Sequence, residues 1–306
     1  MKSGKSVTDN FQLIWKDALS QARAERQVEW DSLHAENLYG ASMVGSCLRA
    51  SYLSRAGYPT TNHPSQETQV IFDIGHQIES WFMDIISKYV VENNFGYIDF
   101  QAESKDDYHY AHTDGLWVTE DFAMPIEIKS IASDAVDYRE RTNGGVWTPY
   151  PHHSLQIAQF MLLSERNGGY VAANGKTLPV TDTGLIFYIA KDGRIRISTV
   201  VLEELKSELL RRMSILEKAW DSVTPPEKQE DGDKYPCSFG KVGTCRFWDL
   251  CWGIKSPRTP KGSIAYLQGR GYEVKKKDSM YYVQGFDTPL TNEGLINFAV
   301  EMKENE

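Results

Sequence analysis

The segment from His112 to Ile131 constrains this chain more than any other part of it. Its second half, Met124 to Ile131, is rich in residues that favour an extended strand. Because side chains alternate along a strand, Glu127 and Lys129 share one face, and the neighbouring isoleucines share the other. The sequence therefore predicts a strand that presents an acid and a base side by side.

A further carboxylate precedes this strand. Asp114 is followed by Gly115, where a turn can release the backbone, and a strand ending near Asp114 would bring its side chain alongside Glu127. Two carboxylates and an ammonium group on one spot are costly unless a divalent cation and a phosphate complete the site. The pattern is typical of metal-dependent phosphodiester hydrolysis. A solvated polar face is the plainer interpretation of Glu-x-Lys, but this strand is otherwise apolar.

Over roughly residues 40 to 255, the chain resembles the PD-(D/E)XK nucleases of the RecB-like branch. It is close to the iron–sulfur members typified by the AddB nuclease domain and the CRISPR-associated RecB-like nucleases. The residues that match the family motifs are the motif-one histidine His76, the aspartate Asp114, the Glu-x-Lys pair Glu127 and Lys129, the segment Gln156 to Phe160, and the cysteines Cys47, Cys237, Cys245 and Cys251. Two positions depart from the pattern: Phe160 replaces a tyrosine, and seven residues rather than the usual two separate Cys237 from Cys245.

The resemblance implies an α/β fold with a restriction-endonuclease-like core, in which helices flank a central mixed sheet. It also implies a cysteine-ligated metal-cluster segment and a small C-terminal α+β appendage. The implied catalytic residues are Asp114, Glu127, Lys129 and Gln156, and the implied ligands of Mg²⁺ or Mn²⁺ are His76, Asp114, Glu127 and the backbone carbonyl of Ile128. Lys129 would orient or deprotonate the attacking water, or neutralise charge on the phosphate. Gln156 would bind that water or the DNA strand.

The cysteines form a second group of potential ligands. The chain has four of them, and both zinc and a 4Fe–4S cluster accept four thiolates. Four free buried thiols are the plainer alternative, although the grouping of Cys237, Cys245 and Cys251 argues against it. The resemblance favours a 4Fe–4S cluster, which would fasten the C-terminal segment to the helix that carries Cys47.

Charge is unevenly distributed along the chain. The net charge is −9, yet residues 234–277 contain ten Lys and Arg against Asp249 and Glu273, so this stretch carries +8 and the remainder −17. A basic rim beside an acidic metal site can bind a phosphate backbone. Lys275 and Lys276 are therefore candidate DNA contacts, with a solvated charged loop as the alternative, and Phe160 is either a base-stacking platform or part of the core.

Three parts are expected along the chain: an N-terminal helical segment at 1–40, a nuclease domain at 41–255, and a hairpin–helix unit at 256–306. Within them, helices are predicted at 9–36, 42–57, 66–92, 153–165 and 202–222, and strands near 96–103, 108–118, 123–131, 183–190 and 194–201. On the long helix, Glu79 lies three residues after His76 and is its expected partner. We also expect a hairpin around Lys277 to Ser279, followed by a helix capped by Thr291.

The leading functional hypothesis is a metal-dependent exonuclease on single-stranded DNA or DNA ends, acting in recombination, repair or phage DNA processing. A helicase or recombination protein would be its partner. The alternatives are a CRISPR-adaptation nuclease within a complex and a non-catalytic DNA-binding module with a metal staple. No apolar run approaches the roughly 18 residues of a membrane span, and no signal-peptide core follows Met1, so a cytoplasmic protein with no membrane contact is expected.

Overall fold

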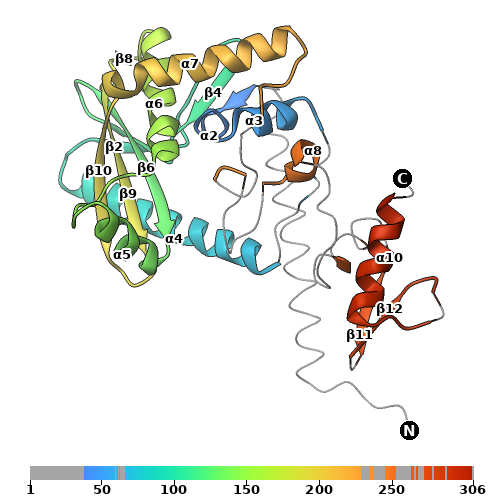
Figure 1. The fold of residues 1–306 in the computed structure, drawn as a ribbon. Helices are drawn as coiled ribbons and strands as arrows, with labels where there is room; N and C mark the ends of the chain where they lie inside the picture. Colours follow the sequence, from blue (N-terminus) through green and yellow to red (C-terminus); the bar gives the residue numbers. More distant parts are fainter. Residues whose placement is uncertain are drawn as a thin grey trace.

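The computed structural model describes residues 38–58, 60, 62, 66–228, 235–237, 245–252, 263–264, 267, 272–277, 279–286 and 288–304 (Figure 1). The helix predicted at 9–36 and much of the basic stretch at 234–277 lie outside these ranges. Within them, no helix is long and apolar enough to cross a membrane.

A five-stranded mixed sheet forms the centre of the fold. Its strand order is β10-β9-β6-β5-β2, and β6 pairs in parallel with β9 but antiparallel with β5. The strands are β2 (Tyr97–Phe100), β5 (Gly115–Val118), β6 (Ala123–Ile131), β9 (Thr183–Ala190) and β10 (Ile195–Val201). The expected α/β class with a mixed sheet flanked by helices is confirmed, and the strand that carries Glu127 and Lys129 lies in the middle of it.

Two helices cover the opposite faces of this sheet. On one face α4 (Gln66–Glu92) packs Met83 and Val90 against Ile126 and Ile128 of β6. On the other face lies α6 (Pro151–Arg166), which is apolar along most of its length and belongs to the larger core cluster. The helix α7 (Leu202–Asp221) packs against α6 in the same cluster (Figure 1). The alternation predicted for β6 is confirmed, because its isoleucines face α4 and its polar pair faces α6.

The remaining described elements surround this core. A second sheet has the order β1-β4-β3, from β1 (Tyr39–Gly40), β3 (Glu103–Lys105) and β4 (His109–His112). A short ribbon pairs β7 (Tyr170–Val171) with β8 (Thr177–Leu178). The other helices of this region are α2 (Ala41–Gly45), α3 (Leu48–Arg55), α5 (Ser133–Thr142) and α8 (Trp248–Trp252).

Two predicted elements differ from the structure. The single helix expected at 42–57 is two helices, because the backbone is extended at Ser46 and Cys47. The strand expected at 108–118 is also divided, with β4 in the small sheet and β5 in the large one. The break between those strands contains Asp114, so the division of this strand creates the site.

The C-terminal residues have their own apolar cluster. The strands β11 (Val274–Lys277) and β12 (Met280–Val283) form the predicted hairpin, and α10 (Asn292–Glu304) follows. The Gly294 N–H donates to Thr291 Oγ1 over 3.1 Å, which confirms the predicted cap. Leu267, Tyr281, Val283, Leu295 and Ala299 are buried together in this cluster.

Candidate active site

Asp114 is held against the middle of β6 by two hydrogen bonds. Its Oδ2 accepts from the Ile128 N–H over 2.7 Å, and the preceding residue, Thr113, donates its hydroxyl to the Ile126 carbonyl over 2.7 Å. Thr113 is fully buried. These bonds place the Asp114 carboxylate beside the backbone that joins Glu127 to Lys129, as the sequence predicts.

Glu127 is the most enclosed acidic group of the site, with only 1% of its surface exposed. Its Oε1 accepts a hydrogen bond of 2.6 Å from the Gln156 amide of α6 and is also paired with the Lys129 ammonium group. Its Oε2 is buried and has no hydrogen-bond partner among the described residues. A buried carboxylate oxygen without a partner is unusual, and an ion or a ligand donor would satisfy it.

Burial and mutual charge shift the acidity of all three groups. Burial, followed by the negative charge of Asp114, raises the pKa of Glu127 to about 8, against the lowering effect of Lys129. Burial likewise raises the pKa of Asp114, although Lys129 and the Ile128 N–H lower it. For Lys129, burial lowers the pKa, but Glu127 and Asp114 outweigh it and the net pKa is raised. Ionising both carboxyl groups costs free energy, and a bound cation would stabilise their ionised forms.

The donor set fits a hard divalent cation. Carboxylate oxygens are its preferred ligands, and Mg²⁺ is commonly bound by one or two carboxylates together with water and phosphate oxygens. The described residues contain no group of three or more His, Cys, Asp or Glu side chains able to hold a metal ion by themselves. Asp114 and Glu127 would therefore hold a cation jointly with water or substrate oxygens.

Two glycines allow α4 to approach the sheet at this site. A Cβ on Gly75 would lie 2.8 Å from Ser130 Oγ, and a Cβ on Gly115 would lie 2.1 Å from Met83 Cε. Gly115 was expected to release a turn, but it is the first residue of β5 and is required for packing against α4.

His76 and Glu79 form the predicted pair on α4, with 3.2 Å between Nδ1 and Oε2. The negative charge of Glu79 contributes to the raised pKa of Asp114 and of Glu127, so this carboxylate acts electrostatically on the site. The His76 side chain is 67% exposed. The structure thus links His76 to the site through Glu79, and its role as a metal ligand stays a prediction.

Three aromatic residues beside Lys129 were not anticipated from the sequence. Tyr188 of β9 is aligned with Lys129 in the parallel register, and its hydroxyl accepts from the Tyr150 N–H over 3.0 Å. His153, at the start of α6, places Nδ1 3.2 Å from the same hydroxyl. Burial, then the charges of His152 and Lys129, lowers the pKa of His153 to about 2, so its ring is uncharged at neutral pH. The adjacent residues His152 and His153, shortly before Gln156, were the sequence feature that could have indicated this group.

Cys47, Cys237, Cys245 and Cys251 all lie in the described part of the chain, form no disulfide there, and influence the acidity of one another. Burial raises the pKa of Cys245, and the proximity of Cys47, Cys237 and Cys251 raises it further. The Cys245 N–H donates to the Cys237 carbonyl over 2.8 Å, and Cys47 is the residue that precedes α3. Residues far apart in the sequence therefore share one neighbourhood, although the described residues contain no group of three or more His, Cys, Asp or Glu side chains placed to hold a metal ion.

Of the predicted DNA contacts, Phe160 requires correction. It is 1% exposed within the larger core cluster, so its ring offers no surface to a base. Lys275 and Lys276 are exposed on β11, where Lys275 pairs with Glu273 at 2.9 Å and Lys276 lies 5.2 Å from the centre of the Tyr281 ring. Their contact with DNA remains a prediction.

Comparisons with known proteins give matches among solved structures only. No protein-family model matches the sequence, and no curated protein matches it. Among solved structures, the chain is similar to the alkaline exonuclease LHK-Exo from Laribacter hongkongensis, with 12% sequence identity and a TM-score of 0.36. The similarity covers 60% of this chain and 91% of that exonuclease.

Proposed function

We propose that this protein is a divalent-metal-dependent deoxyribonuclease of the PD-(D/E)XK type, from the RecB-like branch. The observation that carries the proposal is that Asp114 is bonded to the backbone between Glu127 and Lys129, while the buried Oε2 of Glu127 has no hydrogen-bond partner among the described residues. A structural ion pair would not require a second buried carboxylate, which raises the cost of ionising the first.

Each residue has a role that follows from its position. Asp114 and Glu127 would hold Mg²⁺ or Mn²⁺, which when bound polarises a phosphate and acidifies water. Lys129 holds an ammonium proton beside Glu127, where it can orient the water or neutralise charge on the phosphate. Gln156 fixes the orientation of the Glu127 carboxylate through Oε1 and leaves Oε2 for a ligand.

Cleavage of end-labelled DNA tests this function. Degradation should require Mg²⁺ or Mn²⁺, stop in chelator, and fall by at least about 100-fold in Lys129→Ala, the scale of a lost electrostatic catalytic group. The matched control is Lys88→Ala, which removes an exposed lysine of α4 whose side chain is 75% exposed. Undiminished cleavage by Lys129→Ala, or in chelator, would refute the proposal.

We propose single-stranded DNA, or DNA with free ends, as the substrate. A comparison of linear single strands, blunt duplexes and closed circles, with each linear substrate labelled at one end, measures the need for an end and the polarity together. Binding should weaken steeply with salt because phosphate contacts release counterions. Rapid nicking of closed circular duplex would contradict an exonuclease.

For the cysteines, we propose a structural 4Fe–4S cluster, with zinc as the alternative. The support is the shared neighbourhood of four thiols, of which Cys47 is distant from the others in sequence. Anaerobically purified protein should contain about four irons per chain and absorb in the visible range. Cys47→Ser should lose the metal and soluble yield. Zinc without iron would exclude the cluster, and protein without either metal would exclude the staple.

A further inference from the structure

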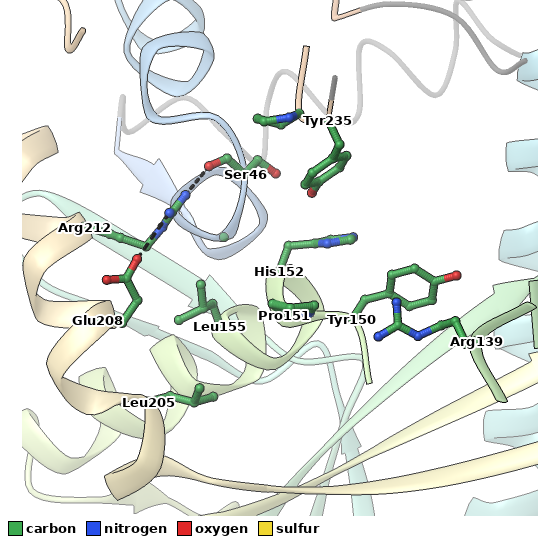
Figure 2. Close-up of a pocket in the computed structure, with 12 residues that line it drawn as sticks. Ser46, Arg139, Tyr150, Pro151, His152, Leu155, Leu205, Glu208, Arg212 and Tyr235 are labelled. Atoms are coloured by element: carbon green, nitrogen blue, oxygen red, sulfur yellow. Dashed lines mark hydrogen bonds and ion pairs between the residues drawn. The ribbon is translucent and has the colours of Figure 1, made fainter. Parts of the chain in front are cut away.

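A cavity of about 600 Å³ opens at the start of α6 (Figure 2). We name it the α6 pocket. Leu155 and Leu205 contribute an apolar part of its lining, and the rings of Tyr150, His152 and Tyr235 also border it. None of these residues belongs to the proposed catalytic set.

The aromatic side of the α6 pocket is formed by rings already in contact. The His152 and Tyr150 ring centroids are 5.7 Å apart, and those of His152 and Tyr235 are 5.5 Å apart with an interplanar angle of 33°. Burial, followed by the charges of Lys129 and Arg139, lowers the pKa of His152 to about 4. At neutral pH this imidazole is uncharged, so it offers a flat ring rather than a cation.

Arg139 and Arg212 line the pocket, and the guanidinium group of each donates hydrogen bonds to backbone carbonyls of the protein. Arg139 donates to the Thr148 carbonyl over 2.9 Å and to the Pro149 carbonyl over 2.7 Å. Arg212 donates to the Val44 carbonyl. It also donates to the Ser46 carbonyl and is paired with Glu208 (Figure 2). Their hydrogen bonds hold the walls in place, so the lining favours a flat uncharged group over a phosphate.

The α6 pocket adjoins the catalytic groups. The Tyr150 backbone N–H donates to Tyr188, which is aligned with Lys129 on the neighbouring strand. The charge of Lys129 is also among the causes of the lowered His152 pKa. A strand whose phosphate lies at Lys129 would therefore have a neighbouring nucleotide close to the pocket.

We propose that the α6 pocket is a nucleobase-stacking subsite, which receives one base of the DNA strand near the phosphate being cleaved. The proposal rests on the proposed nuclease function. Stacking uses the face that all bases share, so the subsite would fix the register of the strand without selecting its sequence.

Binding of a labelled thymidine oligonucleotide in chelator, followed by fluorescence anisotropy, tests this subsite. Tyr235→Ala should weaken binding by about 5- to 150-fold, the fold-change that corresponds to one base–aromatic stack. Tyr235→Phe keeps the ring and should bind as the wild type does. Tyr89→Ala, which removes a 60% exposed tyrosine from α4, is the control and should change little.

A series of strands with one abasic site at successive positions locates the stacked base. At one position the abasic strand should bind the wild type more weakly, and Tyr235→Ala should add no further loss there. Additive losses at every position, or wild-type affinity of Tyr235→Ala, would overturn the subsite. Metal-dependent cleavage by the same wild-type preparation tests the nuclease separately, so the two failures are distinguishable.

Discussion

The Asp114 carboxylate accepts a hydrogen bond of 2.7 Å from the backbone N–H of Ile128, the residue between Glu127 and Lys129. This bond crosses from the break before β5 to the centre of β6 and fixes one charged side chain against the backbone that carries two others. An accidental pair of surface charges would have no such backbone support. Asp114 therefore has two features that a mutation can separate: an oxygen that accepts this hydrogen bond, and a negative charge.

Asp114→Asn should keep the fold and lose activity. The Asn Oδ1 can accept the same bond from Ile128, but the amide cannot supply an anionic ligand. We expect an unfolding midpoint close to that of the wild type, with cleavage reduced by at least about 100-fold. Asp114→Ala, which loses both features, should also be less stable by about 1–3 kcal/mol. Substantial cleavage by Asp114→Asn would show that its charge is unnecessary.

Because of its raised pKa, Glu127 should make the free energy of unfolding decrease as pH rises. Its pKa is raised to about 8 in the folded protein, so the folded state binds more protons than the unfolded state, in which the ordinary value is about 4.3. In chelator, the free energy of unfolding should therefore decrease between about pH 4 and pH 8. Denaturant titrations at several pH values measure this decrease. Glu127→Gln should make this decrease smaller but not abolish it, because the raised pKa of Asp114 acts in the same direction. The same slope in both proteins would contradict the assignment.

The charge on Asp106 should have the opposite effect. Although burial raises the pKa of this carboxyl group, hydrogen bonds from the His109 ring and from the backbone N–H groups of Tyr108 and His109 hold it well below its ordinary range. Its stabilising contribution is present above about pH 4 and is lost as pH falls toward the lowered folded pKa. Asp106→Asn should cost about 1–3 kcal/mol at neutral pH and much less in acid. Asp107→Asn, at an exposed neighbouring position, is the control for urea unfolding.

Gly75→Ala should destabilise the protein only while Ser130 keeps its hydroxyl. The new Cβ would lie 2.8 Å from Ser130 Oγ, whereas the Ser130 Cβ is 3.9 Å away. In a Ser130→Ala background the same change should become neutral or stabilise by up to about 1 kcal/mol, the helix preference of alanine over glycine. A double-mutant cycle on the free energy of unfolding measures this reversal. Equal effects in both backgrounds would show that the close approach is unimportant.

Local pattern determined much of this protein. Alternating side chains placed Glu127 and Lys129 on one face of β6, since a strand permits only two faces. The helical period of the apolar residues predicted α4, which spans Gln66–Glu92 as expected, and Thr291 marked the start of α10. These features depend on neighbours within a few residues, and so the sequence contains enough information to predict them.

Contacts between distant segments were decided only by the tertiary structure. The sequence could not show that Phe160 is buried in the core, because one face of an apolar helix is not distinguishable from another by spacing when nearly the whole helix is enclosed. It likewise could not show that Tyr188 lies beside Lys129, since the register of β6 on β9 is set by packing on both faces of the sheet. The charges of the site came from the sequence; its enclosure, and thus the shifted acidity of Glu127, came from the fold.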